Sequence, residues 1–446
     1  MRADVCIIGA GPAGLISAAL LDQAGIETVV VEHRTRDYVL QRVRAGVLEQ
    51  ATVETLRRLG AAERLDREGL VHEGFVLAFN GAMVRIAFPD LVPGRHVTVY
   101  GQTELVRDLI AHREGAGRTL LFETEAVAIE QLDDAPRVVC RCGGETVVVS
   151  CRLVFGCDGF HGLARRALPP DRLKTYEIAY PFGWLGLLAD VPPAHRELVY
   201  SASDRGFALC SMRSPTRSRY YVQVAATERL EDWPEERFWA ELRRRLPAEI
   251  AAQVTEGPAI ERSIAPLRSF VAEPMRLGRL LLLGDAAHVV PPTGAKGLNL
   301  AAADAWYAAR AAIALSADGR RGGARRLFRR RPGTGLAHGA LLVDDDAADA
   351  YLPRSRAFRG EDAGSRTRLP RHLARRPHDD RRKLCRTSAR LTWGRSPPSP
   401  PAIAPPTRRG STPAIARRSS VARASPWSLF PPPPRWSRHR IFPLSL

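Results

Sequence analysis

A glycine-rich turn close to the amino end constrains the fold of this chain more than any other feature. Val5–Ile8 has the apolar composition of a short strand, and the run GAGPAG at residues 9–14 follows it directly. An amphipathic helical stretch at residues 15–24 comes next, and a second apolar strand, Thr28–Val31, ends at Glu32. Strand, glycine turn, helix, strand and acid in this order predict a βαβ unit that binds a dinucleotide.

Each residue type in this turn has a physical role. Gly9 suits the tight turn, Gly11 lets the backbone approach a pyrophosphate, and Gly14 lets the helix pack closely on the strand. Glu32 is placed to accept hydrogen bonds from a ribose hydroxyl. A glycine pattern alone is weak evidence, but the flanking strands and the acid make an accidental match improbable.

Two further acids follow apolar, strand-like stretches. Residues 152–155 lead into GCDG with Asp158, and residues 280–283 lead into GDAAH with Asp285. The second loop continues to an alanine-rich helical stretch that begins near Leu300. A helix start offers free N–H groups and a positive dipole end to a phosphorylated cofactor, although an ordinary strand–loop–helix connection has the same outline.

The GxGxxG, DG and GD motifs together resemble the FAD-dependent aromatic hydroxylases, which are single-component flavoprotein monooxygenases. The similarity extends from residue 1 to about residue 321. Within the family, four further blocks are similar to the members that hydroxylate 4-hydroxybenzoate. They are residues 38–50, 69–74, 100–104 and 291–299.

The resemblance implies an α/β fold: a doubly wound, Rossmann-like FAD domain with an inserted, sheet-rich substrate domain. The FAD domain is expected at residues 1–72, 98–178 and 269–321, and the substrate domain at 73–97 and 179–268. The implied reaction converts 4-hydroxybenzoate to 3,4-dihydroxybenzoate with NAD(P)H and O2, through a flavin C4a-hydroperoxide. The cofactor carries this chemistry, and the protein orients substrate, excludes water and controls protons.

The residues themselves point to a small aromatic carboxylate. Residues 205–223 are predicted to form two strands around a turn at residues 214–216. Because side chains alternate along a strand, Ser211 and Arg213 share one face, and so do Arg219 and Tyr221 on the second strand. Hydroxyl, guanidinium and phenol groups suit a carboxylate, although a polar outer face of a hairpin is an equally good interpretation of the pattern alone.

The resemblance assigns roles to particular residues. Ser211, Arg213 and Tyr221 match the carboxylate-binding residues, with Met212 beside them, and Tyr200 matches the tyrosine that contacts the phenol. The Pro292 carbonyl is expected to orient the phenolic hydroxyl, His72 to connect a proton network to solvent, and Arg219 to lie near the flavin. The expected FAD contacts are Gly9, Gly11, Gly14, Glu32, Arg42, Val43, Arg44, Ala45, Gly46, Val47, Gln102, Asp158, Asp285, Gly297, Leu298 and Asn299.

The reduced nicotinamide nucleotide is expected to contact Arg34, Tyr38, His161 and Arg268, again by resemblance. The basic run at residues 33–36 favours the 2′-phosphate of NADPH, but the choice between NADPH and NADH stays open. An aromatic-acid hydroxylase of the salicylate type and an inactive FAD-binding product are the alternative functions. No metal site is expected.

The composition changes sharply near residue 322. Residues 322–446 contain 27 basic against 8 acidic residues and half of the 34 prolines, whereas residues 1–321 are close to neutral. Such a tail would ordinarily suggest nucleic-acid binding or disorder. Arginine- and proline-rich text is also what GC-rich DNA yields when it is read out of frame.

Back-translation favours a shifted frame. Residues 381–389 can be encoded so that a start one base later gives AENYVGLP, which is similar to the family segment with the second active-site tyrosine. The same shift turns residues 325–328 into DAYS and residues 341–346 into SWWMM. We therefore expect a single-base change near residues 322–324, with residues 322–446 as an out-of-frame, non-native or disordered tail.

The net charge of +18 belongs to that tail, so nucleic-acid and membrane partners are not expected. The seven cysteines lack metal or disulfide spacing, no signal peptide is apparent, and no apolar run is long enough to span a membrane. These observations predict a cytoplasmic protein. Members of the family form homodimers, and the altered tail makes a dimer doubtful here.

Overall fold

The computed structural model describes residues 1–41 and 46–320. Four of the expected FAD contacts, Arg42, Val43, Arg44 and Ala45, lie outside the described residues. The predicted out-of-frame tail lies outside them as well and remains a prediction.

A six-stranded sheet carries the dinucleotide motif. Its neighbouring strands run parallel except for the pair at one edge, β18 and β19. This arrangement confirms the predicted α/β fold. In spatial order the strands are β18 Arg276–Leu277, β19 Leu280–Leu282, β12 Leu153–Gly156, β1 Val5–Ile8, β2 Thr28–Val31 and β8 Leu120–Leu121.

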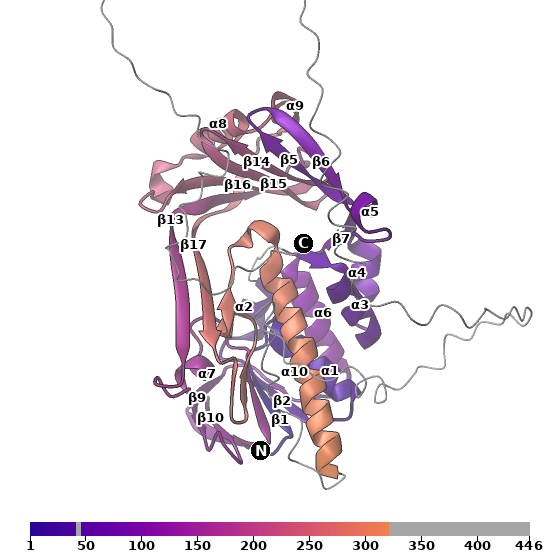
Figure 1. Cartoon of the computed structure of the whole chain (residues 1–446), viewed down its shortest axis with the longest axis vertical. Coiled ribbons are helices and arrows are strands. Elements are labelled where there is room, and N and C mark those ends of the chain that lie inside the picture. Colours follow the sequence, from indigo (N-terminus) through magenta and orange to yellow (C-terminus); the bar gives the residue numbers. More distant parts are fainter. Residues whose placement is uncertain (42–45, 321–446) are drawn as a thin grey trace, which may run out of the picture. The chain divides into compact units, whose positions relative to one another are not determined.

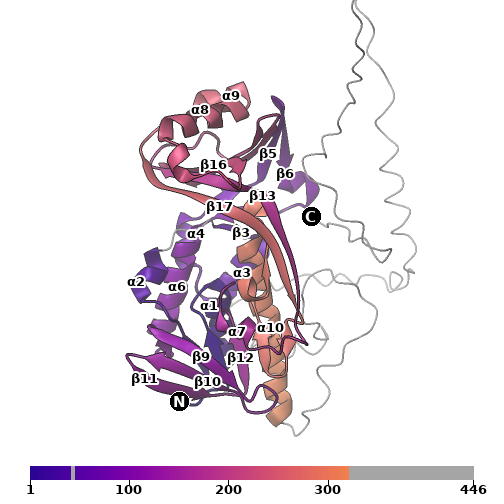
Figure 2. The ribbon, with the colours of Figure 1, turned by 90° about the vertical axis from the view of Figure 1, so that its left-hand side faces the viewer.

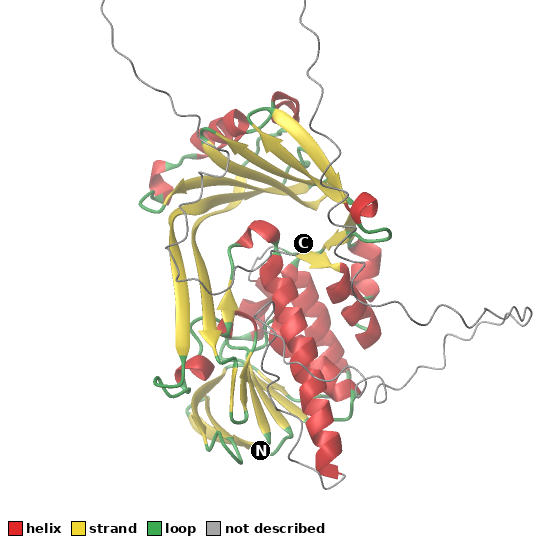
Figure 3. Ribbon diagram, viewed as in Figure 1, coloured by secondary structure: helices red, strands yellow, loops and turns green. Residues whose placement is uncertain are grey.

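The two faces of this sheet are covered differently (Figure 3). Ile7 and Val30 point to a core shared with the helices α1 (Pro12–Gln23), α6 (Gln102–Gly115) and α10 (Lys296–Arg320). Cys6 and Val29 point to a core shared with a three-stranded antiparallel sheet. That sheet consists of β9 Thr124–Glu130, β10 Arg137–Cys142 and β11 Glu145–Ser150.

Two helices begin earlier than the sequence pattern suggested. α1 begins at Pro12 rather than at residue 15, because Gly11 caps it and a proline is tolerated in the first turn, where its missing N–H is not needed. α10 begins at Lys296 rather than near Leu300, so Gly297 lies within its first turn.

The second large sheet has eight strands and is mostly antiparallel (Figure 1). Its two longest strands, β13 and β17, run side by side and cross the predicted domain boundaries at residues 178 and 268. In spatial order the strands are β20 His288–Val289, β17 Ala259–Glu273, β13 Lys174–Ala189, β16 Arg217–Ala225, β15 Gly206–Ser214, β14 Leu198–Ser203, β5 Gly74–Phe79 and β6 Ala82–Ala87.

One face of this sheet packs against the helices α8 (Glu235–Arg245) and α9 (Ala248–Gln253), as Figure 2 shows. Leu187 and Tyr220 from the sheet meet Phe238 and Trp239 of α8 in a buried core. Since strand residues alternate between faces, Tyr221 points to the opposite face. That opposite face is where the expected substrate residues lie.

A small sheet and several short helices complete the described part of the chain. The sheet has the order β3 (Val47–Glu49), β7 (Val97–Val99) and β4 (Leu70–His72). In the described residues, no helix is long and apolar enough to cross a membrane. The remaining helices are α2 Arg36–Gln41, α3 Gln50–Leu59, α4 Glu63–Glu68, α5 Phe88–Leu91 and α7 Leu163–Arg166, with the 3-10 turns η1 Leu230–Asp232, η2 Gly284–Ala286 and η3 Pro292–Gly294.

Candidate active site

The three acids predicted from the sequence gather at one edge of the six-stranded sheet. β2, β1, β12 and β19 are parallel and end in register. Glu32 follows the end of β2 directly, Asp158 follows β12, and Asp285 lies in η2 after β19. Ligands of open α/β sheets bind at the carboxyl ends of the strands, so this edge is the candidate cofactor site.

The glycine turn is tightly packed on one side and open on the other. A Cβ atom on Gly9 would lie 2.4 Å from the carbonyl oxygen of Cys157, and Gly9 has a φ of +107°. A Cβ atom on Gly14 would lie 2.0 Å from the Gly9 oxygen. Gly11, the N-cap of α1, has no such neighbour within 4 Å. The turn therefore offers open space at the start of a helix, where a phosphate group fits.

Glu32 is buried and held by backbone groups around it. Its Oε2 accepts a hydrogen bond from the Ala10 amide at 2.9 Å, and its Oε1 accepts one from the Arg34 amide at 2.9 Å. The Nδ1 atom of His33 lies 2.9 Å from the same Oε1. These contacts fix the carboxylate beside the glycine turn.

Asp158 has a carboxylate oxygen without a partner. Its Oδ2 accepts a hydrogen bond from the Ala164 amide at 2.8 Å, whereas Oδ1 is buried and unpaired. Burial raises the pKa of Asp158, and backbone N–H groups partly oppose that shift. A buried, unpaired oxygen is costly, so a hydrogen-bond donor on a ligand would improve this site.

Gly46 and Gln102 lie far apart in the sequence, but their backbones pack closely against each other. A Cβ atom on Gly46 would lie 1.8 Å from the Tyr100 carbonyl oxygen and 2.7 Å from the Gln102 nitrogen. The Gly46 oxygen accepts the Tyr100 amide at 3.1 Å. Only glycine allows this close approach, which places Val47 at the start of β3.

Asn299 uses its side chain to fasten α10 to β3. Its Oδ1 accepts hydrogen bonds from the Glu49 amide and the Thr52 hydroxyl, both at 2.9 Å. Its Nδ2 donates to the carbonyl oxygens of Val47 at 2.9 Å and Ala295 at 3.0 Å. The side chain is thus engaged within the protein, and it holds the amino end of α10 in place.

These residues fit a flavin dinucleotide. The space at Gly11 suits a pyrophosphate, and the unpaired Oδ1 of Asp158 suits a hydroxyl donor. A Cβ atom on Gly297 would have no neighbour within 4 Å, so the first turn of α10 can approach a flat ring closely. Leu298 is partly exposed in the same turn.

A row of residues crosses the face of the eight-stranded sheet that α8 does not cover. Tyr200 on β14 pairs with Leu209 on β15, which pairs with Tyr221 on β16, which pairs with Gly186 on β13. The lack of a side chain at Gly186 leaves room for its neighbour, because a Cβ atom there would lie 2.9 Å from a Tyr221 ring carbon. The row therefore brings both tyrosines to one surface.

Two arginines lie beside this row. Arg219 pairs with Ser211 across the strands and donates from Nη2 to Glu261 at 3.1 Å and to Ser263 at 3.4 Å. Arg213 lies at a bulge where the pairing of β15 with β16 shifts, and its Nη1 is buried without a hydrogen-bond partner. Burial lowers the pKa of Arg213, and Tyr221 opposes that shift. An unpaired buried guanidinium N–H is a site for an anion.

Aromatic rings line the same surface. The ring of Trp184 stacks on Phe207 with centroids 5.1 Å apart and lies 5.3 Å from Tyr221. Tyr200 meets Phe75 edge-on at 5.6 Å, and burial raises the pKa of Tyr200 to about 12. Its phenol therefore keeps its proton at neutral pH.

Two further expected substrate contacts are Pro292 and Met212. Pro292 begins η3, and its carbonyl oxygen accepts the Ala295 amide at 3.0 Å, which leaves one lone pair for another donor. Ala295 belongs to the apolar cluster that also contains Tyr200 and Tyr221. Met212 is partly buried on β15, beside Ser211.

His72 lies at the end of β4 and is 2% exposed. Both of its ring nitrogens are buried without a partner. Burial lowers the pKa of His72, Glu197 partly offsets the shift, and His195 adds to it. Glu197 directly precedes β14, the strand that carries Tyr200.

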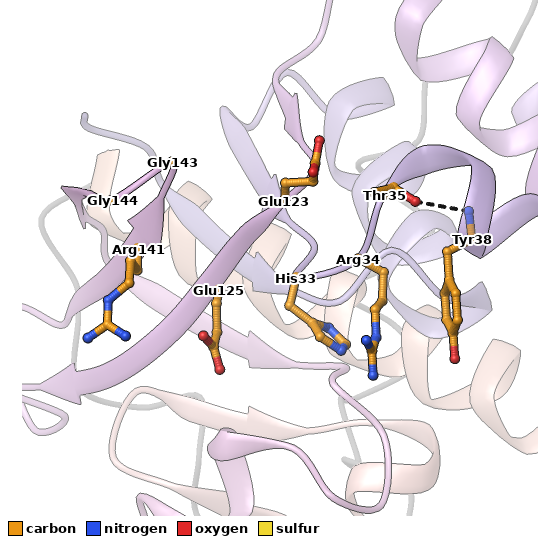
Figure 4. A pocket seen from close by; sticks show the side chains of 9 residues that line it. All are labelled: His33, Arg34, Thr35, Tyr38, Glu123, Glu125, Arg141, Gly143 and Gly144. Carbon is orange, nitrogen blue, oxygen red and sulfur yellow. Dashed lines mark hydrogen bonds between the residues drawn. The ribbon is translucent and has the colours of Figure 1, made fainter.

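Arg34 and Tyr38 line a pocket of about 400 Å³ (Figure 4). The guanidinium carbon of Arg34 lies 4.8 Å from the centre of the Tyr38 ring. Both cations and carboxylates face the pocket, so it presents donors as well as acceptors. Its lining consists of His33, Arg34, Thr35, Tyr38, Glu123, Glu125, Arg141, Gly143 and Gly144.

His161 and Arg268 gather at a different place, around Phe160. The His161 ring lies 4.9 Å from the Phe160 ring, and the Arg268 guanidinium lies 4.8 Å from it. Arg165 joins them, stacked over Phe160 at 4.8 Å and over Phe270 at 4.6 Å. The four expected nicotinamide-nucleotide contacts thus form two groups.

Comparisons with known proteins agree with this geometry. A family model described as an FAD binding domain matches residues 2–326. The p-hydroxybenzoate hydroxylase of Acinetobacter baylyi is 52% identical over 319 residues, which are 72% of this chain and 79% of that protein. This chain belongs to the family of FAD-dependent aromatic hydroxylases. FAD is therefore its cofactor, as the sequence motifs predicted.

More distant relatives extend the family. The 6-methylpretetramide 4-monooxygenase of Streptomyces rimosus is 30% identical over 322 residues, covering 68% of this chain and 73% of that protein. The crystal structure of p-nitrophenol 4-monooxygenase from Pseudomonas putida DLL-E4 has a TM-score of 0.60 at 19% identity, covering 71% of this chain and 81% of that one. At that identity, the second likeness shows a shared hydroxylase fold only.

Three residues of the hydroxylase site were not predicted from the sequence. Arg165 donates a hydrogen bond from Nη1 to the Ala286 carbonyl oxygen at 2.9 Å and so supports the GD turn. His288 and Asp304 form a buried pair behind the same turn. A signal was present in Asp304, which interrupts the alanine-rich face of α10 with a carboxylate.

Proposed function

We propose that the function of this protein is to hydroxylate 4-hydroxybenzoate to 3,4-dihydroxybenzoate. The reaction uses NADPH or NADH and O2, and it releases the oxidised nucleotide and water. The observation that carries the proposal is the buried, unpaired Nη1 of Arg213 beside Ser211 and the Tyr200–Tyr221 row. The 52% identity to p-hydroxybenzoate hydroxylase supports the same substrate.

Arg213 binds the substrate carboxylate in this proposal, with Ser211 and Tyr221 as additional hydrogen-bond donors. A charge-assisted hydrogen bond to a buried guanidinium is stronger than one between neutral groups. The aromatic wall of Trp184 and Phe207 provides an apolar surface nearby, which suits a benzene ring. Met212 adds flexible apolar contact beside Ser211.

The phenol end of the substrate meets Tyr200 and the Pro292 carbonyl in this proposal. Ring hydroxylation by an electrophilic oxygen needs an electron-rich ring, so the protein promotes ionisation of the substrate phenol. Tyr200 donates a hydrogen bond to the phenolate, and its own high pKa keeps that proton available. His72 passes the released proton towards solvent as a neutral base, in keeping with its lowered pKa.

FAD, when bound, supplies the activation of O2 and the oxygen transfer. The proposed contacts are the glycine turn with Glu32, the acids Asp158 and Asp285, the Gly46–Gln102 contact and the first turn of α10. Arg219, which pairs with Glu261, is proposed to lie near the flavin. Residues 73–97 and 179–268 are the proposed substrate domain.

We propose that Arg34 and Tyr38 bind the adenosine end of the reduced nucleotide. His161 and Arg268 are proposed to contact the rest of the same nucleotide. The pocket at Arg34 supports this assignment because it combines a stacked cation and ring with carboxylates that accept ribose hydroxyls. We also propose a cytoplasmic location, since all six cysteines in the described part of the chain are free.

The test is turnover by a purified, FAD-loaded protein in which the C-terminal reading frame has been restored. We expect NAD(P)H oxidation that depends on 4-hydroxybenzoate and forms 3,4-dihydroxybenzoate in equal amount. Salicylate serves as the comparison substrate. Faster coupled turnover with salicylate would contradict the proposed substrate and favour the other aromatic-acid hydroxylases.

A further inference from the structure

The GD turn is wedged between two helices. Gly284 has a φ of +60° within η2, and a Cβ atom there would lie 3.3 Å from the Ala301 side chain of α10 and 3.4 Å from the Ala13 side chain of α1. The turn therefore cannot shift without disturbing both helices. Asp285 follows Gly284 directly and is one of the three acids proposed to contact FAD.

A buried carboxylate holds this turn from behind. The Oδ2 atom of Asp304 accepts the Gly284 amide at 2.9 Å and lies 2.7 Å from Nε2 of His288. Asp304 is 9% exposed, and the His288 side chain is 13% exposed. One carboxylate oxygen thus binds the first residue of the turn and a residue that comes shortly after it.

The charges around His288 favour its protonated form. Burial by itself lowers the pKa of His288, but the hydrogen bond and charge of Asp304, together with Asp285, raise it above the ordinary 6.5. Cys157 of the DG motif lies close enough to Asp304 to interact with its charge, and Arg165 contacts the turn through the Ala286 carbonyl. The pair is therefore a charged contact below the raised pKa of His288 and a weaker contact above it.

We propose that Asp304 and His288 are positioning residues for FAD: their ion pair holds the Gly284–Ala286 turn, and with it Asp285, in the flavin-binding conformation. FAD affinity consequently falls when His288 loses its proton. The inference rests on the assignment of FAD to this site, and it does not depend on which aromatic acid is hydroxylated.

The sign of the pH dependence is set by the direction of the shift. The ion pair is fully formed below pH 6.5 and is lost as the pH rises through the higher pKa of folded His288. The dissociation constant for FAD, measured by quenching of flavin fluorescence on the full chain between about pH 6 and about pH 8.5, is therefore expected to rise with pH.

Two variants separate charge from hydrogen bonding. Asp304→Asn keeps an acceptor for the Gly284 amide but removes the charge, so we expect about tenfold weaker FAD binding at about pH 6 and little pH dependence. His288→Gln keeps an uncharged amide donor towards Asp304 at every pH and so mimics the deprotonated histidine. Its FAD affinity should match that of the unmodified chain at high pH and should not depend on pH. Asp66→Asn, which breaks the exposed pair with Arg57, is the matched control.

The proposal is overturned if Asp304→Asn follows the pH profile of the unmodified chain, or if the unmodified chain shows no rise. Thermal unfolding of each apoprotein shows whether a variant has lost its fold. If Asp304→Asn is unfolded, the pH profile of His288→Gln alone tests the proposal. The same variants in the frame-restored protein give the result if the full chain is insoluble. Hydroxylation is not measured, so a wrong substrate assignment leaves this test intact.

Discussion

Arg213 lies where β15 departs from regular pairing, and its guanidinium interacts with Tyr221 of the neighbouring strand. Because its Nη1 is buried without a partner, this arginine would gain a hydrogen bond from an anionic ligand. Substrate affinity is therefore expected to depend on it strongly.

We predict that Arg213→Lys raises the KM for 4-hydroxybenzoate by roughly 10- to 100-fold, because lysine loses the paired N–H geometry of a guanidinium. Steady-state kinetics of the frame-restored protein provide the measurement. Arg217→Lys, on the same hairpin but in an exposed pair with Asp190, should change KM less than about twofold. An unchanged KM for Arg213→Lys would show that the carboxylate binds elsewhere.

His72 gives a prediction about stability and pH. Its pKa is lowered by burial, so the folded state leaves His72 neutral in a range below pH 6.5 where the unfolded state binds a proton. The free energy of unfolding should therefore fall as the pH drops below 6.5. His72→Gln should flatten this dependence in urea titrations, whereas His112→Gln, at an exposed position on α6, should leave the slope as it was.

At the scale of the element, two glycines at the start of α1 allow packing and cofactor binding to be tested separately. Gly14→Ala places a Cβ atom 2.0 Å from the Gly9 oxygen, so we predict a loss of stability of several kcal/mol, seen as a lower Tm of the apoprotein. Gly11→Ala meets no atom within 4 Å and should leave the Tm nearly unchanged. It should nevertheless weaken FAD binding about tenfold or more, because the methyl group occupies the space assigned to the pyrophosphate.

β13 supplies the corresponding test for the substrate surface. Gly186→Ala would place a Cβ atom 2.9 Å from the Tyr221 ring and 3.1 Å from Nη2 of Arg219. We predict a destabilisation of about 1–3 kcal/mol and a KM for 4-hydroxybenzoate raised about tenfold, because both side chains must move. Gly115→Ala, at the end of α6 with open space around it, is the control and should change neither value.

At the scale of the whole molecule, β13 and β17 belong to the sheet that carries the proposed substrate surface, and β17 also pairs with β20, which comes just after the GD turn. Flavin edge and substrate surface are thus joined by continuous strands. The family match ends at residue 326, close to the position where the basic tail begins. We therefore expect the activity of the molecule to depend on the sequence beyond α10.

We predict that the frame-restored protein oxidises NAD(P)H in a 4-hydroxybenzoate-dependent manner and that the chain with its basic tail does not. Resequencing of the gene and parallel assays of the two forms provide the measurement, with flavin absorbance as the report on FAD binding. Equal activity in the two forms, or an intact reading frame in an active chain, would show that the tail is native.

The local sequence was sufficient for the cofactor half of the fold. Glycine spacing and apolar strand composition are local properties, so β1, β2 and the acids after β2, β12 and β19 were predictable at their positions. The helix starts at Pro12 and Lys296 were missed by about three or four residues, because capping depends on backbone geometry that composition does not report.

Local motifs were enough to identify the family, the FAD cofactor and the residue types available to the site. The tertiary structure alone decided which of those residues meet. It brought Tyr200 into a row with Tyr221, placed Arg213 at an irregularity of the strand pairing, and placed Asp304 behind the GD turn. These contacts join positions distant in the chain, and their geometry is set by strand register and close packing, which no local pattern encodes.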